Sequence, residues 1–261
     1  MKKINVGIAG GAGYTGGELL RILVHHPEVH ISFVHSSSNA GKPVSAVHTD
    51  LVGDTDLLFT SSFSENIDLL FLCVGHHESK KILAEQPISP SVCIIDLSQD
   101  FRLTPNATIG DRTFVYGLPE LNREKITTAK NIANPGCFAT AIQLALLPLA
   151  KAGLLQDIYT TGITGSTGAG QSLSATSHFS WRANNIQAYK TLDHQHVFEI
   201  VQSLNHLQSD APLSTGGEGT GLHFVPWRGD FTRGIYTSSV IDCSLPLEAV
   251  QEMYASYYAA H

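Results

Sequence analysis

The sequence has little of what marks membrane, nucleic-acid-binding or secreted proteins. No apolar run reaches the roughly 18 residues of a membrane-spanning helix, and no Lys/Arg-rich run offers the basic surface that binds nucleic acid. The first residues carry two lysines but no long apolar segment with a small-residue cleavage site. The 23 acidic residues outnumber the 16 basic ones, and only 15% of the 261 residues are charged. We therefore expect a cytoplasmic protein with neither a membrane nor a nucleic-acid partner.

Cysteine is scarce as well. The four cysteines contain no C-x-x-C pair and lie too far apart for a disulfide scaffold or a structural zinc site. Three of them, Cys73, Cys93 and Cys243, occur in or beside strand-like runs, where a lone cysteine is usually a small buried hydrophobe. We expect those three to be buried, which leaves Cys137 as the cysteine with a different setting.

The hydrophobic pattern indicates two domains. Over residues 1–134, short β-branched runs alternate with helical patterns, which is typical of parallel βαβ units. The predicted fold class is α/β, a Rossmann-like doubly wound parallel sheet followed by a second, α+β domain over residues 135–261. A Gly/Ser/Thr-rich stretch at 214–219 is predicted to be a loop. The strands predicted in the first domain are residues 4–9, 29–35, 69–74, 92–97 and 131–133. The second domain is predicted to hold strands at 159–164, 186–189, 222–225 and 235–242 and helices at 138–152, 197–207 and 247–258.

A glycine-rich turn follows the first predicted strand and precedes a predicted helix. Glycines permit a tight turn and a close approach of a pyrophosphate, and the N–H groups that open a helix donate to its negative charge. A turn without a ligand has the same composition, but the strand-turn-helix context favours a dinucleotide site. The predicted cofactor contacts in this turn are Gly10, Gly11, Ala12, Gly13, Tyr14, Thr15 and Gly16.

The end of the second predicted strand distinguishes NAD from NADP. An NAD site usually places Asp or Glu there to bind the ribose 2′-hydroxyl, but residues 35–42 read HSSSNAGK and contain no acid. The hydroxyls of Ser36 and Ser38, with a nearby cation, suit a 2′-phosphate, so NADP is the predicted cofactor. A solvated serine loop is the alternative interpretation. Gly75, which follows a later strand, is predicted to lie near the same cofactor.

The motif Asn134-Pro135-Gly136-Cys137 precedes an apolar helix. Proline and glycine favour a sharp turn, which leaves Cys137 at the helix N-terminus, where the macrodipole and unpaired N–H groups favour thiolate over thiol. A buried, inert thiol is the commoner role of a cysteine. The turn-to-helix setting nevertheless favours a nucleophile at Cys137.

Two histidines lie just before a predicted helix that carries Glu199. A thiolate that forms a thioester needs a nearby acid or base, and His194 and His196 point the same way if their segment is extended, so that Glu199 can orient one ring. Zinc binding is the other interpretation of a His-x-His motif. No further Cys/His cluster completes such a site in the sequence, so no metal is predicted.

Together these motifs resemble the N-acetyl-gamma-glutamyl-phosphate reductase family of arginine biosynthesis. They occur in the family's order over nearly the whole chain, and the most specific are the cysteine motif and the segment Asp100-Phe101-Arg102. The segments that carry the resemblance are residues 10–16, 96–102, 116–120, 134–137, 165–170 and 194–196.

The resemblance implies an NADPH-dependent reduction of an N-acyl-gamma-glutamyl phosphate to its semialdehyde. In that reaction Cys137 expels phosphate to form a thioester, and hydride from NADPH reduces it. His194 matches the family's acid/base, with Glu199 as its partner. The implied partners are a small-molecule substrate, phosphate and further copies of the chain, which would associate through the second domain.

Three features depart from the family pattern. Gln171 stands where family members commonly have Arg, after the Gly-Ala-Gly of the second glycine-rich loop. Family members also have Pro-Met shortly before an Arg-Gly-Ile segment, whereas here Pro226-Trp227 is separated from Arg233 by a longer stretch. Because both changes concern the expected pocket, an acidic acyl group such as succinyl is a hypothesis beside acetyl. The chain also ends at His261, where family members continue with a strand and a helix, so we expect a fragment.

Other functions fit the residues less well. Aspartate-semialdehyde dehydrogenase shares the chemistry and the two-domain plan, but its cysteine lies in an Asn-Cys-Thr setting. A short-chain dehydrogenase needs Tyr-x-x-x-Lys, and none of the eight tyrosines has Lys four residues later. A non-enzymatic NADP-sensing module would explain the glycine turn but would leave Cys137 and His194 without a role.

Overall fold

The computed structural model describes residues 3–215 and 220–261. Residues 216–219, most of the stretch predicted as a loop, lie outside the described residues. The chain forms two compact units. The N-terminal unit comprises residues 1–117 and 124–134, and the C-terminal unit comprises residues 118–123 and 135–261.

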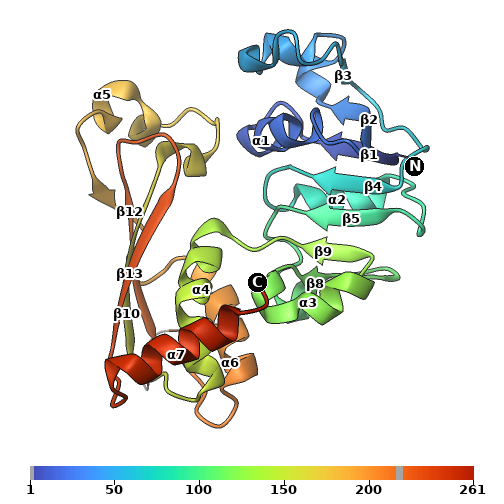
Figure 1. Ribbon diagram of the computed structural model, residues 1–261. Coiled ribbons are helices and arrows are strands. Elements are labelled where there is room, and N and C mark those ends of the chain that lie inside the picture. The colour runs from blue at the N-terminus through green and yellow to red at the C-terminus, as the bar shows by residue number, and fades with distance from the viewer. Residues whose placement is uncertain (1–2, 216–219) are drawn as a thin grey trace. The chain divides into compact units, whose positions relative to one another are not determined.

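A parallel sheet forms the centre of the N-terminal unit. Its strands are β1 (Ile4–Ala9), β2 (Val29–His35), β3 (Phe59–Thr60), β4 (Leu69–Leu72), β5 (Cys93–Asp96), β8 (Val115–Tyr116) and β9 (Asn131–Ala133). They run in the order β3-β2-β1-β4-β5-β9-β8, and each neighbouring pair within this described sheet is parallel (Figure 1). The strand order reverses at β1, because β2 and β4 pair with its opposite edges. The predicted Rossmann-like, doubly wound sheet is confirmed.

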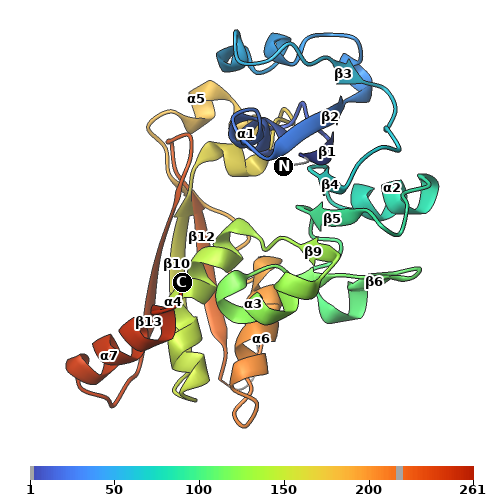
Figure 2. The same cartoon turned by 45° about the vertical axis from the view of Figure 1, so that its right-hand side comes forward.

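Helices and apolar strand residues complete this unit. The helices α1 (Tyr14–Leu23) and α2 (Glu78–Glu85) join successive parallel strands, and a small hairpin of β6 (Thr108–Ile109) and β7 (Arg112–Thr113) projects from the unit (Figure 2). The strands are apolar on both faces, as expected for a sheet covered on both sides. Fully buried side chains on these strands include Val6, Ile8, Leu70, Leu72 and Ile94.

The C-terminal unit is built on a mixed four-stranded sheet. Its strands are β10 (Ile158–Thr164), β11 (Gln187–Ala188), β12 (Leu222–Arg228) and β13 (Ile235–Ile241), and its helices are α4 (Cys137–Lys151), α5 (Phe179–Arg182), α6 (His196–Leu207) and α7 (Leu247–Tyr258). The order is β11-β12-β10-β13, with β10 parallel to β12 and antiparallel to β13. A further helix, α3 (Pro119–Thr128), is kinked at Asn122.

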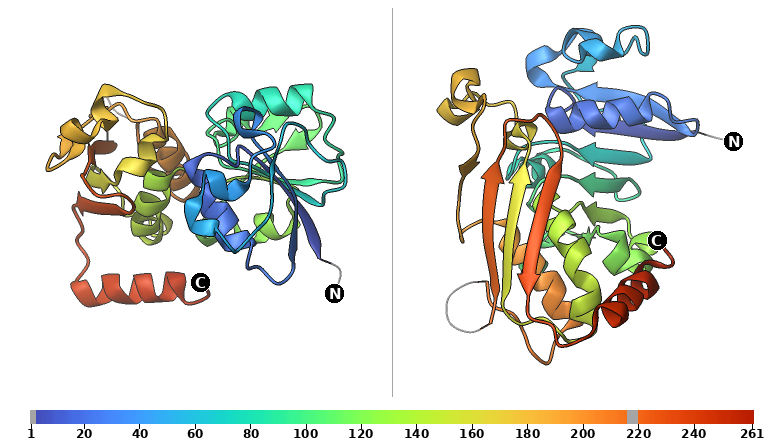
Figure 3. Two further views of the ribbon diagram at one scale, coloured as in Figure 1. Left: turned by 90° about the horizontal axis from the view of Figure 1, so that it is seen from above. Right: turned by 60° about the vertical axis from the view of Figure 1, so that its left-hand side comes forward.

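One face of this sheet is buried and the other is exposed. Figure 3 (right) shows the three long strands side by side with α4 against one face, and α4 in turn packs against α6. The alternating side chains of Ile158 and Thr160 are buried beneath these helices, whereas those of Tyr159 on β10 and Val240 on β13 are exposed. The sequence prediction ended β12 too early, at Val225, because the next residue is a proline, which seldom occurs inside a strand.

A proline inside α4 explains how α7 attaches. Pro148 has no N–H, so the carbonyl of Leu144, four residues earlier, lacks its usual helical donor. The hydroxyl of Tyr258 donates to this carbonyl at 2.5 Å, and the hydroxyl of Tyr254 donates to the neighbouring carbonyl of Ala145. Two tyrosines of α7 thus satisfy backbone groups of α4.

In the part of the chain that the structure describes, no helix has the length and apolarity that a membrane span needs.

Candidate active site

The glycine-rich turn lies between β1 and α1, where the sequence predicted it. Gly10 has a φ of +78°, which favours glycine, and a Cβ there would lie 2.4 Å from the carbonyl oxygen of Cys73. A Cβ on Gly16 would lie 2.7 Å from the carbonyl oxygen of Gly10. Gly13 is the N-cap of α1 and offers no capping side chain. No capping side chain therefore accepts hydrogen bonds from the first N–H groups of α1, which leaves these donors for a pyrophosphate.

A buried histidine supports this turn, and sequence reasoning missed it. His48 has 5% of its surface exposed, and its Nε2 lies 2.7 Å from the carbonyl oxygen of Gly11. Its ring packs so closely on α1 that a Cβ on Gly17 would lie 2.5 Å from its Cε1. No motif marks His48, because the contact joins segments 37 residues apart.

The residues after β2 form a polar network of serine, asparagine and lysine side chains. Asn39 donates from Nδ2 to the hydroxyls of Ser36 and Ser38, at 3.3 and 3.2 Å, and Lys42 donates to Asn39 Oδ1 at 3.2 Å. Gly75 lies beyond the end of β4, which is parallel to β1 and ends at the same edge of the sheet. The serines, the lysine and the glycine turn thus all follow the carboxyl ends of strands in one sheet, the usual place for a dinucleotide.

Cys137 is the first residue of α4, and its side chain is exposed. The N-cap is Gly136, with φ −66° and ψ 151°, so no side chain caps the helix at the point where the sulfur lies. By contrast, burial raises the pKa of the Cys73 thiol to about 12. Cys243 is exposed, because it lies in the loop after β13 rather than in the strand, so the expectation of burial was wrong for it.

A buried carboxylate holds the turn that precedes Cys137. Glu199, on the first turn of α6, accepts a hydrogen bond from the backbone N–H of Gly136 at 3.0 Å. Its other oxygen lies 3.7 Å from Nε2 of His196. A Cβ on Gly136 would lie 2.4 Å from that nitrogen and 2.7 Å from Glu199 Oε1. Glycine is therefore required here by close packing, and not by its φ.

His194 lies buried in an aromatic setting. Its Nδ1 accepts the backbone N–H of His196 at 3.2 Å, so the neutral ring carries its proton on Nε2. The ring makes edge contacts with the rings of Phe138, Tyr189 and Phe224, at centroid distances of 5.7, 5.7 and 5.5 Å. Burial and the charge of Lys190 lower the pKa of His194 to about 4. The imidazole is therefore uncharged at neutral pH and presents an N–H.

A tyrosine and an arginine adjoin this group, and the sequence did not single out either of them. The guanidinium of Arg228 lies 4.7 Å from the ring centroid of Tyr189. Burial raises the pKa of Tyr189, the neighbouring Arg228 opposes that rise, and a charged Cys137 adds to it. Among residues 3–215 and 220–261, no cluster of three or more His, Cys, Asp or Glu side chains is arranged to hold a metal ion.

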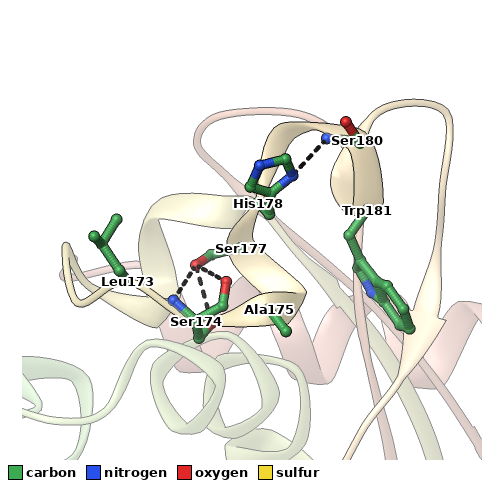
Figure 4. A pocket seen from close by; sticks show the side chains of 7 residues that line it. All are labelled: Leu173, Ser174, Ala175, Ser177, His178, Ser180 and Trp181. Atoms are coloured by element: carbon green, nitrogen blue, oxygen red, sulfur yellow. Dashed lines mark hydrogen bonds between the residues drawn. The ribbon is translucent and has the colours of Figure 1, made fainter.

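The segment between β10 and β11 forms an open pocket of about 650 Å³ (Figure 4). In the figure, the hydroxyls of Ser174 and Ser177 face each other on one wall, and Trp181 lies across from them. No Lys, Arg, Asp or Glu side chain lines the pocket. The pocket thus has no fixed cation with which to bind a phosphate or carboxylate, and we assign no substrate to it. Its lining residues are Leu173, Ser174, Ala175, Ser177, His178, Ser180 and Trp181.

Two family models and several solved structures match this chain. The model described as "Semialdehyde dehydrogenase, NAD binding domain" matches residues 5–129, and that described as "Semialdehyde dehydrogenase, dimerisation domain" matches residues 137–261. Aspartate semialdehyde dehydrogenase II from Vibrio cholerae has a TM-score of 0.68 at 19% identity, over 97% of this chain and 78% of that one. The Candida albicans enzyme with NADP has a TM-score of 0.65 at 15% identity, over 97% and 76%. These structures share the fold.

Sequence relatives are much closer. N-acetyl-gamma-glutamyl-phosphate reductase of Christiangramia forsetii is 51% identical over 98% of this chain and 76% of that protein. The enzymes of Flavobacterium johnsoniae and Bacteroides thetaiotaomicron are 52% and 51% identical, each over 98% of this chain and 77% of the relative. These relatives favour the reductase over the aspartate-semialdehyde dehydrogenase alternative. The chain therefore belongs to the N-acetyl-gamma-glutamyl-phosphate reductase family and is a nicotinamide-dependent oxidoreductase of arginine biosynthesis.

Proposed function

We propose that this enzyme reduces an N-acyl-gamma-glutamyl phosphate through a thioester on Cys137, with NADPH as the reductant. The observation that carries the proposal is the place of Cys137, exposed and first in a helix that has no side-chain cap. The partial positive charge at a helix N-terminus stabilises an adjacent anion by about 0.3–1 kcal/mol, and by up to about 2 kcal/mol when partly buried. That preference favours the thiolate, which is the reactive form.

The first step is an acyl transfer. The Cys137 thiolate attacks the γ-carbonyl carbon, a C–S bond forms, and the bond from that carbon to the phosphate oxygen breaks as phosphate leaves. Negative charge grows on the carbonyl oxygen during the attack. The Nε2–H of His194 can donate to this oxygen, because its Nδ1 is already occupied as an acceptor.

The second step is the reduction of the thioester. NADPH, when bound, supplies a hydride to the thioester carbon. The resulting alkoxide on the substrate is stabilised by the same His194 donor, and its collapse breaks the C–S bond to release the aldehyde and regenerate the thiolate. Glu199 is then a positioning residue: it accepts the backbone N–H of Gly136 and so fixes the turn that places Cys137.

The preference for NADP over NAD rests on the residues after β2. Ser36, Ser38 and Lys42 supply two hydroxyls and a cation, which suit a 2′-phosphate, and no acid stands at the end of the strand to bind a 2′-hydroxyl. We assign the glycine turn from Gly10 to Gly16 and Gly75 to the same cofactor.

We also propose that the enzyme acts in the cytoplasm as a homo-oligomer. The family model that matches residues 137–261 is described as a dimerisation domain. The exposed face of its sheet supports this assignment, because Tyr159, Tyr236 and Val240 expose 56%, 63% and 67% of their surface there. Apolar side chains gathered on one sheet face are typical of a surface that another protein covers.

The test uses the reverse reaction, phosphate-dependent reduction of NADP by an N-acylglutamate semialdehyde. We expect Cys137→Ser to lower kcat/KM at least about 1,000-fold, or about 4 kcal/mol, while NADPH binding measured by fluorescence is unchanged. Cys243→Ser is the matched control, because Cys243 is the other exposed cysteine, and it should keep full activity. An active Cys137→Ser enzyme would remove the thioester from the mechanism.

A further inference from the structure

Arg228 lies on the same face of the sheet as the aromatic residues around His194. It ends β12, and because side chains alternate along a strand, it shares a face with Phe224 and Pro226. The ring of Phe224 on that face contacts the rings of Phe138 and His194, at 5.0 and 5.5 Å. Arg228 therefore projects from the face that carries Phe224, whose ring contacts Phe138 and His194.

The guanidinium of Arg228 is held in place but not neutralised. It stacks on the ring of Tyr189 at 4.7 Å. Its Nε is buried and has no hydrogen-bond partner, and it forms no ion pair with a carboxylate of residues 3–215 or 220–261. A buried donor without an acceptor is costly, and a cation more so. The stacking on Tyr189 fixes the plane of the guanidinium, whose positive charge no carboxylate of the described residues neutralises.

A buried arginine, Arg182, fixes the backbone at this point. Arg182 is 7% exposed, and it donates from Nη1 to the carbonyl of Arg228 at 2.9 Å and from Nη2 to the carbonyl of Thr176 at 3.0 Å. Its Nε is also buried and without a partner. The hydrogen bonds of Arg182 therefore go to neutral carbonyls, so the two cations together leave a positive potential at the end of β12 that attracts an anion.

We propose that Arg228 binds a carboxylate of the substrate, with Tyr189 orienting the guanidinium and Arg182 holding its backbone. This inference rests on the proposed function, whose substrate carries an α-carboxylate and, if the acyl group is succinyl, a second carboxylate. A planar guanidinium matches a carboxylate through two parallel N–H donors, which a lysine ammonium does not. A carboxylate also stays attached to the substrate through both steps, whereas phosphate leaves after the first.

The test compares Arg228→Gln and Arg228→Lys with wild type in the reverse reaction, using N-acetyl- and N-succinylglutamate semialdehyde. We expect Arg228→Gln to raise the KM for a semialdehyde roughly 10- to 100-fold, the range of charge-assisted hydrogen bonds. Arg228→Lys should restore part of that loss, and the KM for phosphate should stay within twofold of wild type. Arg123→Gln is the matched control, because Arg123 is an exposed arginine outside the site.

The two substrates identify which carboxylate is bound. An equal rise in KM for both semialdehydes assigns Arg228 to the α-carboxylate, and a rise for the succinyl compound alone assigns it to the acyl chain. An unchanged KM for both, or a rise in the KM for phosphate instead, overturns the proposal. Failure of the proposed function would appear separately, as activity of Cys137→Ser. Unchanged alkylation of Cys137 by iodoacetamide in Arg228→Gln would show that its site is intact.

Discussion

Gly136→Ala tests whether the close packing before Cys137 matters for both stability and catalysis. The φ of −66° at Gly136 suits alanine, so the substitution brings no backbone strain. The new Cβ would instead lie 2.4 Å from Nε2 of His196 and 2.7 Å from Oε1 of Glu199, both on buried side chains. Real Cβ atoms do not approach so closely, so α6 or the turn must move.

The expected cost has two parts. Overpacking in a close-packed interior costs about 1–3 kcal/mol. Movement of Glu199 away from the Gly136 N–H breaks a hydrogen bond to a charged group, worth about 1.5–3 kcal/mol. The free energy of unfolding should therefore fall by roughly 2.5–6 kcal/mol, which lowers Tm by roughly 5–24 °C at 2–4 °C per kcal/mol for a protein of this size. Since a misplacement of about 1 Å costs about 100-fold in rate, kcat should fall by a similar factor.

Thermal unfolding followed by circular dichroism measures the first effect, and the phosphate-dependent reduction of NADP measures the second. The double variant Gly136→Ala/His196→Ala supplies the control, because it removes the ring that the new methyl would strike. Gly136→Ala should cost less in the His196→Ala background than in wild type. A Gly136→Ala enzyme with wild-type Tm and kcat would refute the packing argument.

Three other substitutions test separate parts of the structure. The pKa of His194 is lowered to about 4 in the folded protein, so as the pH falls the unfolded chain binds this proton before the folded chain does. The free energy of unfolding should therefore fall as the pH drops from about 6.5 to about 4. His194→Gln should reduce this pH dependence, measured by urea unfolding at several pH values. His48→Ala removes the partner of the Gly11 carbonyl and should raise the Kd for NADPH roughly 10-fold, consistent with the loss of one buried hydrogen bond, whereas unchanged affinity in a fluorescence titration would count against a role in the turn. Tyr258→Phe leaves the carbonyl of Leu144 without its hydroxyl donor and should lower the free energy of unfolding by about 1–3 kcal/mol, measured by urea denaturation.

Much of the fold follows from local patterns. The predicted strands at 4–9, 29–35 and 131–133 coincide with β1, β2 and β9, because their β-branched runs are bounded by glycine, proline or polar residues. Strands β3 and β8 have two residues each, too few for any periodic pattern to indicate them. Their place in the sheet depends on pairing with strands already formed.

By itself the sequence determined the local conformations that chemistry needs. A glycine turn between strand and helix, and a Pro-Gly turn that places Cys137 first in a helix, depend on the steric preferences of adjacent residues, which act over only a few positions. Tertiary structure decided which distant groups meet these turns. Glu199 reaches the N–H of Gly136 across 63 residues, and Arg228 stacks on Tyr189 because β11 pairs with β12 in one register. Register and helix packing are set by the whole core, so no local pattern reveals them.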